Sequence, residues 1–369
     1  RELVYQLKQQ GVLKIDKLIV EDSYFITTSI NPTWEWEDLV FDYATPVSSL
    51  ILNENSVTLK LIPEKVGKLL RLEWSDAIAA KQWQVNNQAI AAVQATPYSI
   101  EITRQLGQLT LEIRGKLALD SPPDTFGIAV PNPSQYFLQT LEKMLAEAGI
   151  FVMQGTVTTQ ELKIESEKEM AFIESETLAE LLKKLNQDSN NLYAEAMRNT
   201  LIKESQTYPQ NEALDRQLSA LAVVPKTYKL VDGSGLSRQN LISPVAIVQT
   251  LRLMAKTPLA QTYRDSLAIA GTSGTLQKRF QNTSVSGNLQ GKTGTLSGVY
   301  TLAGYLQIVN FEPVVFSIMV NQTDVPAAKV RNAIDEIVLI LSKLTSDKET
   351  RGNPTKIRSA DFSSLSKIK

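Results

Sequence analysis

The feature of this sequence that most constrains its fold is a change in hydrophobic patterning near residue 165. From Lys14 to about Leu119, β-branched and other apolar residues alternate close to period two, with Asn or Gly where the segments join, which predicts short β-strands. After residue 165, apolar residues recur at helical spacing, as in the leucine stripe over residues 178–185. A chain of 369 residues can bury more than one core, so we expect two or three domains.

Helical patterns also lie near both ends of the chain. The sequence opens inside an amphipathic helix over residues 1–10 that stops at Gly11. Because no N-cap precedes this helix, we expect that the sequence lacks an N-terminal part of its own domain. Residues 285–322 read as three consecutive strands in a meander, and a final helix carries apolar residues over 330–344. The polar, Lys- and Ser-rich residues 346–369 predict a disordered tail.

The composition excludes several kinds of chemistry. The sequence contains no His, which removes the Ser-His-Asp triad, and no Cys, which removes thiol nucleophiles and Cys-based zinc sites. If the protein is a hydrolase, its proton transfers fall to Lys, Ser, Tyr, Asp or Glu, and a buried Lys can act as a base. The net charge is −1 without a long basic tract, so nucleic acid is not an expected partner. No apolar run reaches the roughly 18 residues of a transmembrane segment.

The tripeptide Lys292-Thr293-Gly294 lies early in the first strand of the meander. A strand that lines a cleft offers backbone N–H groups to an extended peptide, and the lysine adds a positive charge beside the terminal carboxylate of that peptide. The threonine adds a hydroxyl donor, and the glycine leaves room for the substrate backbone. An isolated match of this kind more often marks a surface lysine beside a turn, so the tripeptide alone identifies nothing.

The pattern S-x-N occurs three times, at Ser29, Ser189 and Ser286. Each match is compatible with a simple capping or turn motif, because Ser and Asn favour such positions. Ser29 lies in the strand-rich part, and Ser286 leads directly into the strand of Lys292. Ser189, followed by Asn190 and Asn191, lies at a break between two helices and is the candidate for a second wall of a cleft.

Several long blocks of this sequence, in a fixed order, resemble one known protein family more specifically than any tripeptide does. The motifs S-x-x-K, S-D-N and K-T-G characterise β-lactamases and penicillin-binding proteins. The flanking sequence resembles the low-molecular-mass D-alanyl-D-alanine carboxypeptidase/endopeptidase family, peptidase family S13, from residue 1 to about 345. The blocks that carry the resemblance are YATPVSSLILNENSV, FGIAVPNP, LLKKLNQDSNNLYAEAMRNTL, LVDGSGLSRQNLISP, AGTSGTLQKRF and GKTGTLSGVYTLAGYL.

The resemblance implies roles for the residues of these motifs. Ser189 is expected to relay a proton and Asn191 to hold the substrate amide, while Lys292 supports the relay and binds the substrate carboxylate. Thr293 and Gly294 belong to the substrate-binding strand, and the backbone N–H of Thr295 is expected to form half of an oxyanion hole. Asn190 replaces the Asp of the middle motif position. No metal or organic cofactor is implied.

The sequence departs from the family at the nucleophile. The family's attacking serine and base belong to an S-x-x-K motif, and the matches here, Ser364 with Lys367 and Ser366 with Lys369, lie in the polar tail. We therefore expect a fragment whose nucleophilic half precedes residue 1, in preference to a homologue that has lost catalysis. A chain of this kind is expected to form no penicillin adduct by itself.

The predicted fold is an α/β fold of the α+β kind, a β-lactamase/transpeptidase-like domain whose antiparallel sheet is flanked by helices and interrupted by β-rich insertions. The expected limits are a first inserted domain at 1–47 and 126–165, a second at 48–125, and an incomplete catalytic domain at 166–345. The expected activity is a serine-type D-Ala-D-Ala carboxypeptidase/endopeptidase acting on peptidoglycan stem peptides, inhibited by β-lactams and located in the periplasm or elsewhere outside the cytoplasm. The alternatives are a non-catalytic peptidoglycan-binding homologue and a β-lactamase.

Overall fold

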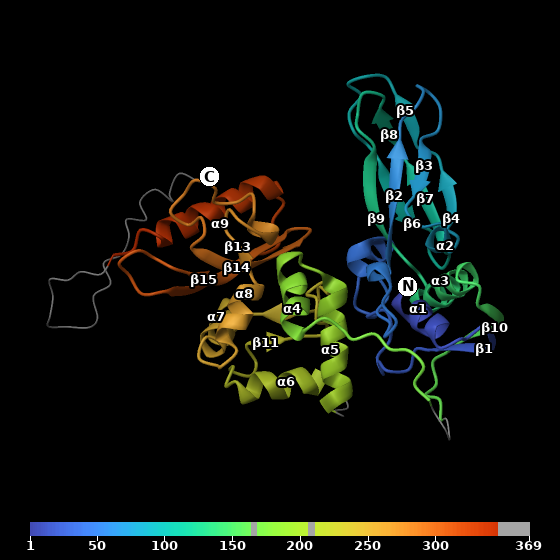
Figure 1. The fold of residues 1–369 in the computed structure, drawn as a ribbon. Helices are drawn as coiled ribbons and strands as arrows, with labels where there is room; N and C mark the ends of the chain where they lie inside the picture. The colour runs from blue at the N-terminus through green and yellow to red at the C-terminus, as the bar shows by residue number, and fades with distance from the viewer. Residues whose placement is uncertain (164–167, 206–210, 346–369) are drawn as a thin grey trace. The chain divides into compact units, whose positions relative to one another are not determined.

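The computed structural model describes residues 1–163, 168–205 and 211–345 (Figure 1). The expected disordered tail, with both S-x-x-K matches, lies outside the described residues. The chain divides into two compact units. Unit 1 comprises Arg1–Glu176, Asn191–Asp215 and Leu230–Asn240. Unit 2 comprises Thr177–Asn190, Arg216–Lys229 and the described residues from Leu241 to Thr345. The domain limits expected from the sequence stay a prediction.

One part of unit 1 is a two-stranded parallel sheet against which helices α1 and α3 pack. Strand β1 (Lys14–Glu21) pairs with β10 (Phe151–Thr158), and helix α3 (Pro133–Glu147) packs on both strands. The predicted opening helix is confirmed as α1 (Glu2–Gln9), and Gly11 follows it with φ +77°, a left-handed value that glycine adopts without strain.

The β-rich part of unit 1 is built from short strands around an aliphatic core. Strand β2 pairs antiparallel with β3 and β9, β7 pairs with β4 and β6, and β5 pairs parallel with β8. The bounds are β2 Ser56–Ile62, β3 Arg71–Trp74, β4 Gln84–Asn87, β5 Ile90–Ala92, β6 Glu101–Arg104, β7 Thr110–Arg114, β8 Lys116–Ala118 and β9 Asp124–Ala129. Helix α2 (Ala77–Ala80) and the 3-10 helices η1 (Trp36–Val40), η2 (Asp42–Ala44) and η3 (Asn53–Asn55) complete this part. Its strands alternate buried and exposed residues, as the period-two pattern predicts.

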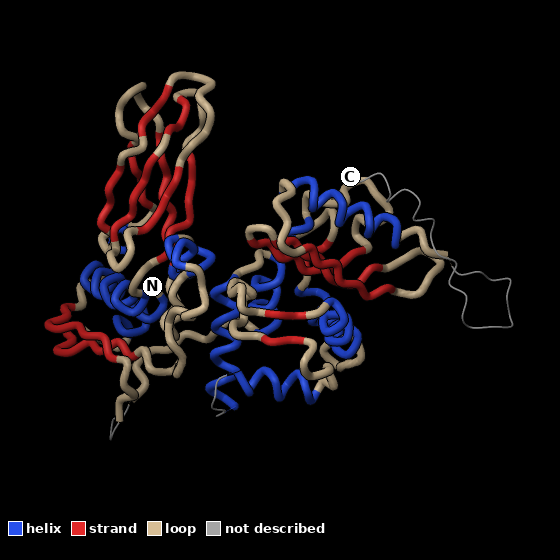
Figure 2. Tube along the Cα trace, turned by 180° about the vertical axis from the view of Figure 1, so that it is seen from behind, coloured by secondary structure: helices blue, strands red, loops and turns tan. Residues whose placement is uncertain are grey.

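Unit 2 is an antiparallel sheet with helices on both faces (Figure 2). The predicted meander is confirmed as β14 (Leu289–Leu296), β15 (Val299–Leu306) and β16 (Val314–Val320), and the structure adds β13 (Ala268–Ile269) as a fourth strand beside β14. The predicted fold, an antiparallel sheet flanked by helices, is therefore confirmed.

Successive side chains of β15 point to opposite faces of the sheet, and each face is covered by its own layer of helices. Leu302 and Leu306 belong to one core with helix α9 (Ala327–Leu341). Tyr305 belongs to another core with helix α7 (Pro244–Met254), and its hydroxyl donates to the carbonyl of Leu251 at 2.7 Å. The remaining elements of the unit are α4 (Leu178–Gln187), α8 (Ala260–Ser266), η4 (Gly274–Leu276), β11 (Tyr228–Lys229) and β12 (Leu241–Ile242). Helix α5 (Asn191–Ser205) belongs to unit 1, and α6 (Asn211–Ala220) crosses the division.

Candidate active site

Ser189 lies directly after helix α4 in a strained backbone conformation. Its φ is +58°, and the N–H of Asn190 donates to the carbonyl of Leu185 at 3.1 Å, the pattern with which a helix ends over a left-handed residue. Glycine is preferred there, because the Cβ of another residue costs about 1–2 kcal/mol. A serine in such a position is a candidate for a functional residue.

The end of α4 is fixed by hydrogen bonds to helix α8. The buried side chain of Asn186 donates to the Ser266 hydroxyl at 2.8 Å, and Gln187 donates to the carbonyl of Leu267 at 3.2 Å. Gly274 packs directly on this helix end, since a Cβ on Gly274 would lie 2.6 Å from the carbonyl oxygen of Gln187. The position of Ser189 is therefore set by backbone packing as well as by its own side chain.

Lys292 on β14 reaches Ser189 across unit 2. Its Nζ donates to Ser189 Oγ at 2.6 Å and to the carbonyl of Thr293 at 2.7 Å. Burial of the ammonium group lowers the pKa of Lys292 to about 8. Near neutral pH this lysine can thus exchange a proton with the serine hydroxyl, while in its charged form it offers a positive charge to an anion.

The edge of β14 next to Lys292 is open. The short strand β13 pairs only with Gln290 and Gly291, and no strand among the described residues pairs with that edge over 292–296. The carbonyl of Leu289 faces this edge, because it accepts the N–H of Ala270. Strand alternation then places the N–H groups of residues 293 and 295 on the same edge, available to an added strand.

Gly294 and Thr293 complete this edge. A Cβ on Gly294 would lie 2.5 Å from Oγ1 of Thr301, its partner on β15, so a side chain here would displace its neighbour. The hydroxyl of Thr293 donates to Thr275 Oγ1 at 2.8 Å, which ties the strand to η4. Thr295 is exposed.

Asn191 belongs to unit 1 and is the first residue of α5. Its side-chain amide donates to the carbonyl of Tyr43 at 2.8 Å. The structure thus brings Ser189, Lys292 and Thr293 together in unit 2, and it anchors Asn191 on η2 of unit 1.

Sequence reasoning missed a buried polar cluster in unit 1. The Asp232 carboxylate accepts hydrogen bonds from the Trp34 indole and from the backbone N–H of Gly235 and Ser237, at 3.1, 2.9 and 2.6 Å. Glu195 on α5 accepts two backbone N–H bonds and the Ser234 hydroxyl of the same turn, and its pKa is raised by burial despite these bonds. The buried turn D-G-S-G-L-S in the sequence was a possible signal of this cluster.

Thr275 was also missed, because a lone Thr in a loop carries no periodic signal. The resemblance block A-G-T-S-G-T-L contains it, and the fold brings it to Thr293.

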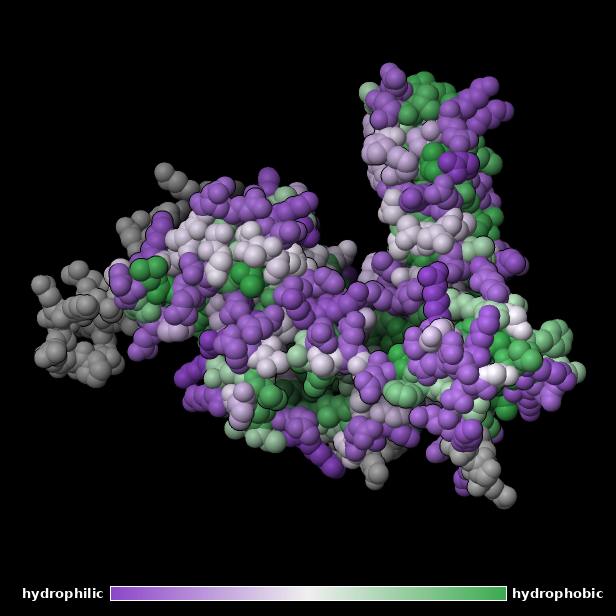
Figure 3. Space-filling view, in the orientation of Figure 1, coloured by the Kyte–Doolittle hydropathy of each residue, from purple (hydrophilic) through white to green (hydrophobic). Residues whose placement is uncertain are grey.

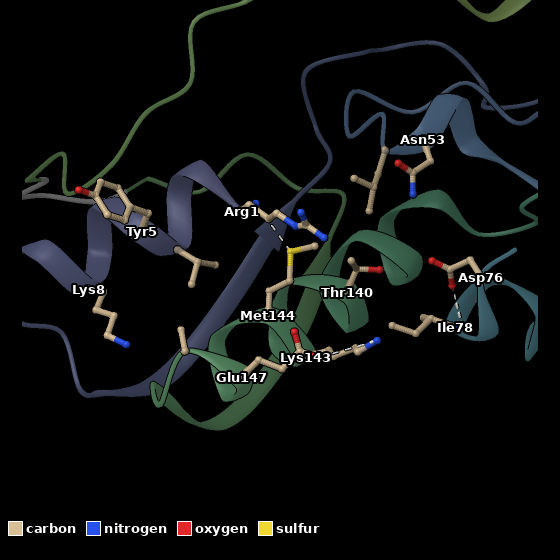
Figure 4. Close-up of a pocket in the computed structure, with 13 residues that line it drawn as sticks. Arg1, Tyr5, Lys8, Asn53, Asp76, Ile78, Thr140, Lys143, Met144 and Glu147 are labelled. Carbon is tan, nitrogen blue, oxygen red and sulfur yellow. Dashed lines mark hydrogen bonds and ion pairs between the residues drawn. The ribbon is translucent and has the colours of Figure 1, made fainter.

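Other possible sites in the described chain offer less chemistry. A cavity of about 490 Å³ lies in unit 1 between α1, α3 and the loops at residues 52 and 76–78 (Figure 4). Its lining contains the Lys143–Glu147 ion pair and the Asp76 carboxylate that caps α2, so these charges already have partners. No group of acidic side chains among the described residues is arranged to hold a metal ion. None of the helices described is both long and apolar enough to cross a membrane.

The comparisons with known proteins cover most of the chain. The sequence profile of the D-Ala-D-Ala carboxypeptidase 3 (S13) family matches residues 1–344. The chain is 28% identical over 356 residues to the penicillin-sensitive carboxypeptidase A of Dictyostelium discoideum, covering 89% of this chain and 67% of that protein. It is 29% identical to a D-alanyl-D-alanine carboxypeptidase of an Actinomadura species (84% and 60% covered) and 28% identical to D-alanyl-D-alanine carboxypeptidase DacB of Haemophilus influenzae (86% and 68% covered).

Solved structures share the fold. The structure of penicillin-binding protein 4 (dacB) from Haemophilus influenzae matches with a TM-score of 0.75 at 24% identity, over 91% of this chain and 78% of that one. At this identity the match establishes the fold alone. The chain spans between 60% and 68% of the length of the three curated relatives.

Proposed function

The chain belongs to the D-Ala-D-Ala carboxypeptidase 3 (S13) family, as its sequence blocks predict, and from this premise we propose that it contributes the substrate-binding and proton-relay half of a peptidase site. The complete protein would act as a D-Ala-D-Ala carboxypeptidase/endopeptidase on peptidoglycan peptides, in the periplasm or another compartment outside the cytoplasm. The observation that carries the proposal is the 2.6 Å contact between Lys292 Nζ and Ser189 Oγ beside an open strand edge.

The proposed reaction uses these residues as follows. A peptide ending in D-Ala-D-Ala adds as a strand to the open edge of β14, with its carboxylate near Lys292 and the hydroxyl of Thr293. The N–H of Thr295 binds the oxyanion that forms at the attacked carbonyl, and Gly294 keeps the edge accessible. The role of Asn191, to hold a substrate amide, stays a prediction from the family resemblance. The attacking serine is not assigned to any described residue.

Ser189 and Lys292 would move the proton that the leaving amine requires. When the acyl-enzyme forms, the attacking serine gives its proton to the lysine of its own S-x-x-K motif, and its oxygen bonds to the carbonyl carbon. The bond between that carbon and the D-Ala nitrogen breaks, and the nitrogen takes a proton from the Ser189 hydroxyl. Lys292 restores that proton, for which a pKa of about 8 is suitable near neutral pH. Water then hydrolyses the ester and frees the enzyme. β-Lactams would acylate the same site.

Penicillin acylation of the product of the complete gene tests this function. We expect a fluorescent penicillin to label it covalently, and Ser189→Ala or Lys292→Ala to slow acylation by roughly 10²–10⁴-fold. Lys183→Ala, an exposed lysine on α4, serves as the matched control with an unchanged rate. Absence of an adduct from a gene product that contains an intact S-x-x-K motif would refute the peptidase function. Rapid turnover of the penicillin would instead assign a β-lactamase.

A further inference from the structure

A small pocket in unit 1 lies between helix α5 and the loop at residues 27–34. Its volume is about 230 Å³, the space of roughly seven or eight water molecules. The loop is held in place by its own side chains, since Asn31 donates to the carbonyl of Val231 at 2.9 Å and the Trp34 indole donates to Asp232. The pocket is therefore preformed, and none of the residues that line it belongs to the proposed active site.

Two buried side chains of α5 line this pocket with unused hydrogen-bonding atoms. Glu195 and Asn199 are each 3% exposed, and their spacing of four residues places them on the same face of the helix. The three hydrogen bonds that Glu195 accepts from the turn at Gly233 and Ser234 all end on Oε1. Its Oε2 therefore has no partner among the described residues, and neither has the side-chain amide of Asn199.

A third unused group comes from the loop that forms the other wall of the pocket. The hydroxyl oxygen of Thr27 is buried and has no hydrogen-bond partner among the described residues. Hydrophilic residues cover much of the surface of unit 1 in Figure 3, where water satisfies them. A buried polar atom without a partner instead costs roughly 1–3 kcal/mol. Three such groups around one pocket indicate that a ligand supplies the hydrogen bonds that the protein does not.

The charges at the pocket favour a cation. Burial raises the pKa of Glu195 above its usual value, and the neighbouring Asp232 carboxylate raises it further. Asp232 is itself bound by four donors, and Arg198, the base in the lining, already has a partner. A positive charge beside Oε2 of Glu195 would offset both the burial of this carboxylate and its repulsion by Asp232.

We propose that this pocket binds the primary ammonium group of a small amine or amino acid. A primary ammonium group donates three hydrogen bonds, and the pocket offers three unused acceptors, Oε2 of Glu195, Oδ1 of Asn199 and Oγ1 of Thr27. A calcium ion would take about six to eight oxygen ligands, twice the number offered here. The proposal does not depend on the peptidase function, since none of the residues in the proposed active site takes part.

Ligand-observed NMR with the full chain tests the proposal. The probes are ethylamine and glycine, which carry a primary ammonium group, and tetramethylammonium, which is a cation without an N–H donor. We expect saturation transfer to ethylamine and glycine, with dissociation constants on the order of 1 mM for ligands of so few atoms, and none to tetramethylammonium. Tighter binding of glycine would assign the pocket to an amino acid, and tighter binding of ethylamine would assign it to an amine without a carboxylate.

Substitutions in the pocket identify the acceptors. Glu195→Gln keeps an oxygen for the turn at Gly233 and puts an N–H donor in place of Oε2, so binding of both amines should fall by about tenfold or more. Thr27→Val keeps the shape of the side chain and removes one neutral hydrogen bond, so binding should fall by about fivefold. The matched controls are Glu204→Gln and Thr200→Val at exposed positions of the same helix, which should bind like the unchanged chain. Circular dichroism of each variant verifies folding.

Several results would overturn the proposal. An absence of saturation transfer to both amines at about 20 mM would show that the pocket holds water only. Equal binding of tetramethylammonium, or unchanged binding in a folded Glu195→Gln variant, would show that the three acceptors do not bind an ammonium group. Displacement of ethylamine by potassium chloride, but not by tetramethylammonium chloride at the same ionic strength, would assign an alkali cation instead. If Glu195→Gln does not fold, unchanged binding in Thr27→Val is the result that refutes the proposal.

Discussion

The two polar clusters of this protein, one in each unit, differ in how completely their atoms are satisfied. In unit 1 the Asp232 carboxylate accepts four hydrogen bonds, including one from Asn240 at 2.7 Å, and the nearby Glu195 accepts three. In unit 2 the buried ammonium of Lys292 meets one hydroxyl and one carbonyl, and that hydroxyl belongs to a strained residue. A saturated cluster stabilises a fold, whereas an undersaturated and strained one keeps bonding capacity for a substrate.

The strongest test of this difference is the replacement Asp232→Ala. It removes the acceptor of four hydrogen bonds, two of them buried, so we expect the free energy of unfolding to fall by about 3 kcal/mol or more. Urea unfolding followed by tryptophan fluorescence measures the loss, since all four tryptophans lie in unit 1, and the Trp34 indole itself donates to Asp232.

An exposed acid of the same unit provides the control. Asp16 forms a surface ion pair with Lys14, and Asp16→Ala is expected to change the free energy by less than about 0.5 kcal/mol. If the two variants lost the same stability, the saturated cluster would not stabilise unit 1, and the contrast between the two clusters would fail.

The next effect concerns the packing that holds Ser189 in place. Gly274→Ala puts a Cβ 2.6 Å from the carbonyl oxygen of Gln187 at a φ of +57°, so we expect a loss of about 2–3 kcal/mol. Gly287 has a φ of +74° with no atom within 4 Å of the added Cβ, and Gly287→Ala should lose only about 1 kcal/mol. Unfolding followed by far-ultraviolet circular dichroism gives both values. Equal losses would show that the helix end is not held by this contact.

A third prediction uses the titration of Lys292. Burial lowers its folded-state pKa from 10.5 to about 8, so between these values the folded protein binds fewer protons than the unfolded chain. The contribution of Lys292 to the free energy of unfolding must therefore rise as the pH rises from about 8 to 10.5. Relative to Lys292→Met, the unchanged chain should gain about 1–2 kcal/mol between about pH 7 and pH 9.5.

The comparison with Lys183→Met separates this effect from general charge effects. Lys183 is exposed on α4, so Lys183→Met removes the same charge from the surface and not from a buried position. A parallel shift of both variants would mean that Lys292 titrates like a surface lysine, and the proposed proton relay would lose its basis.

The sequence predicts the elements of unit 2 better than the distances within them. The meander was readable because strands of seven or eight residues carry enough period-two signal. Strand β13 has two residues and no periodicity to detect, although it decides where the open edge of β14 begins. The order of the motifs along the chain identifies Ser189 and Lys292 as site residues. Whether their side chains meet depends on how helix α4 ends. No pattern predicts that a serine occupies the left-handed position there, because glycine or asparagine is the usual signal.

The smallest effect isolates the strain at Ser189. Both Ser189→Ala and Ser189→Gly remove the hydrogen bond to Lys292, but only glycine relieves a φ of +58°. We therefore expect the glycine variant to be more stable than the alanine variant by about 1 kcal/mol, with penicillin acylation slowed in both in the complete protein. Unfolding in urea, followed by circular dichroism, measures the difference.

The same pair of substitutions at Lys183 must give the opposite order, because alanine is favoured over glycine by about 1 kcal/mol inside a helix. A reversal between two positions so close in the chain can arise only from the backbone conformation, since the side chains compared are identical. If alanine were also the more stable residue at position 189, the backbone there would carry no strain. The contact between Ser189 and Lys292 would then be no more than a capping interaction, and the two polar clusters would differ in bonding alone.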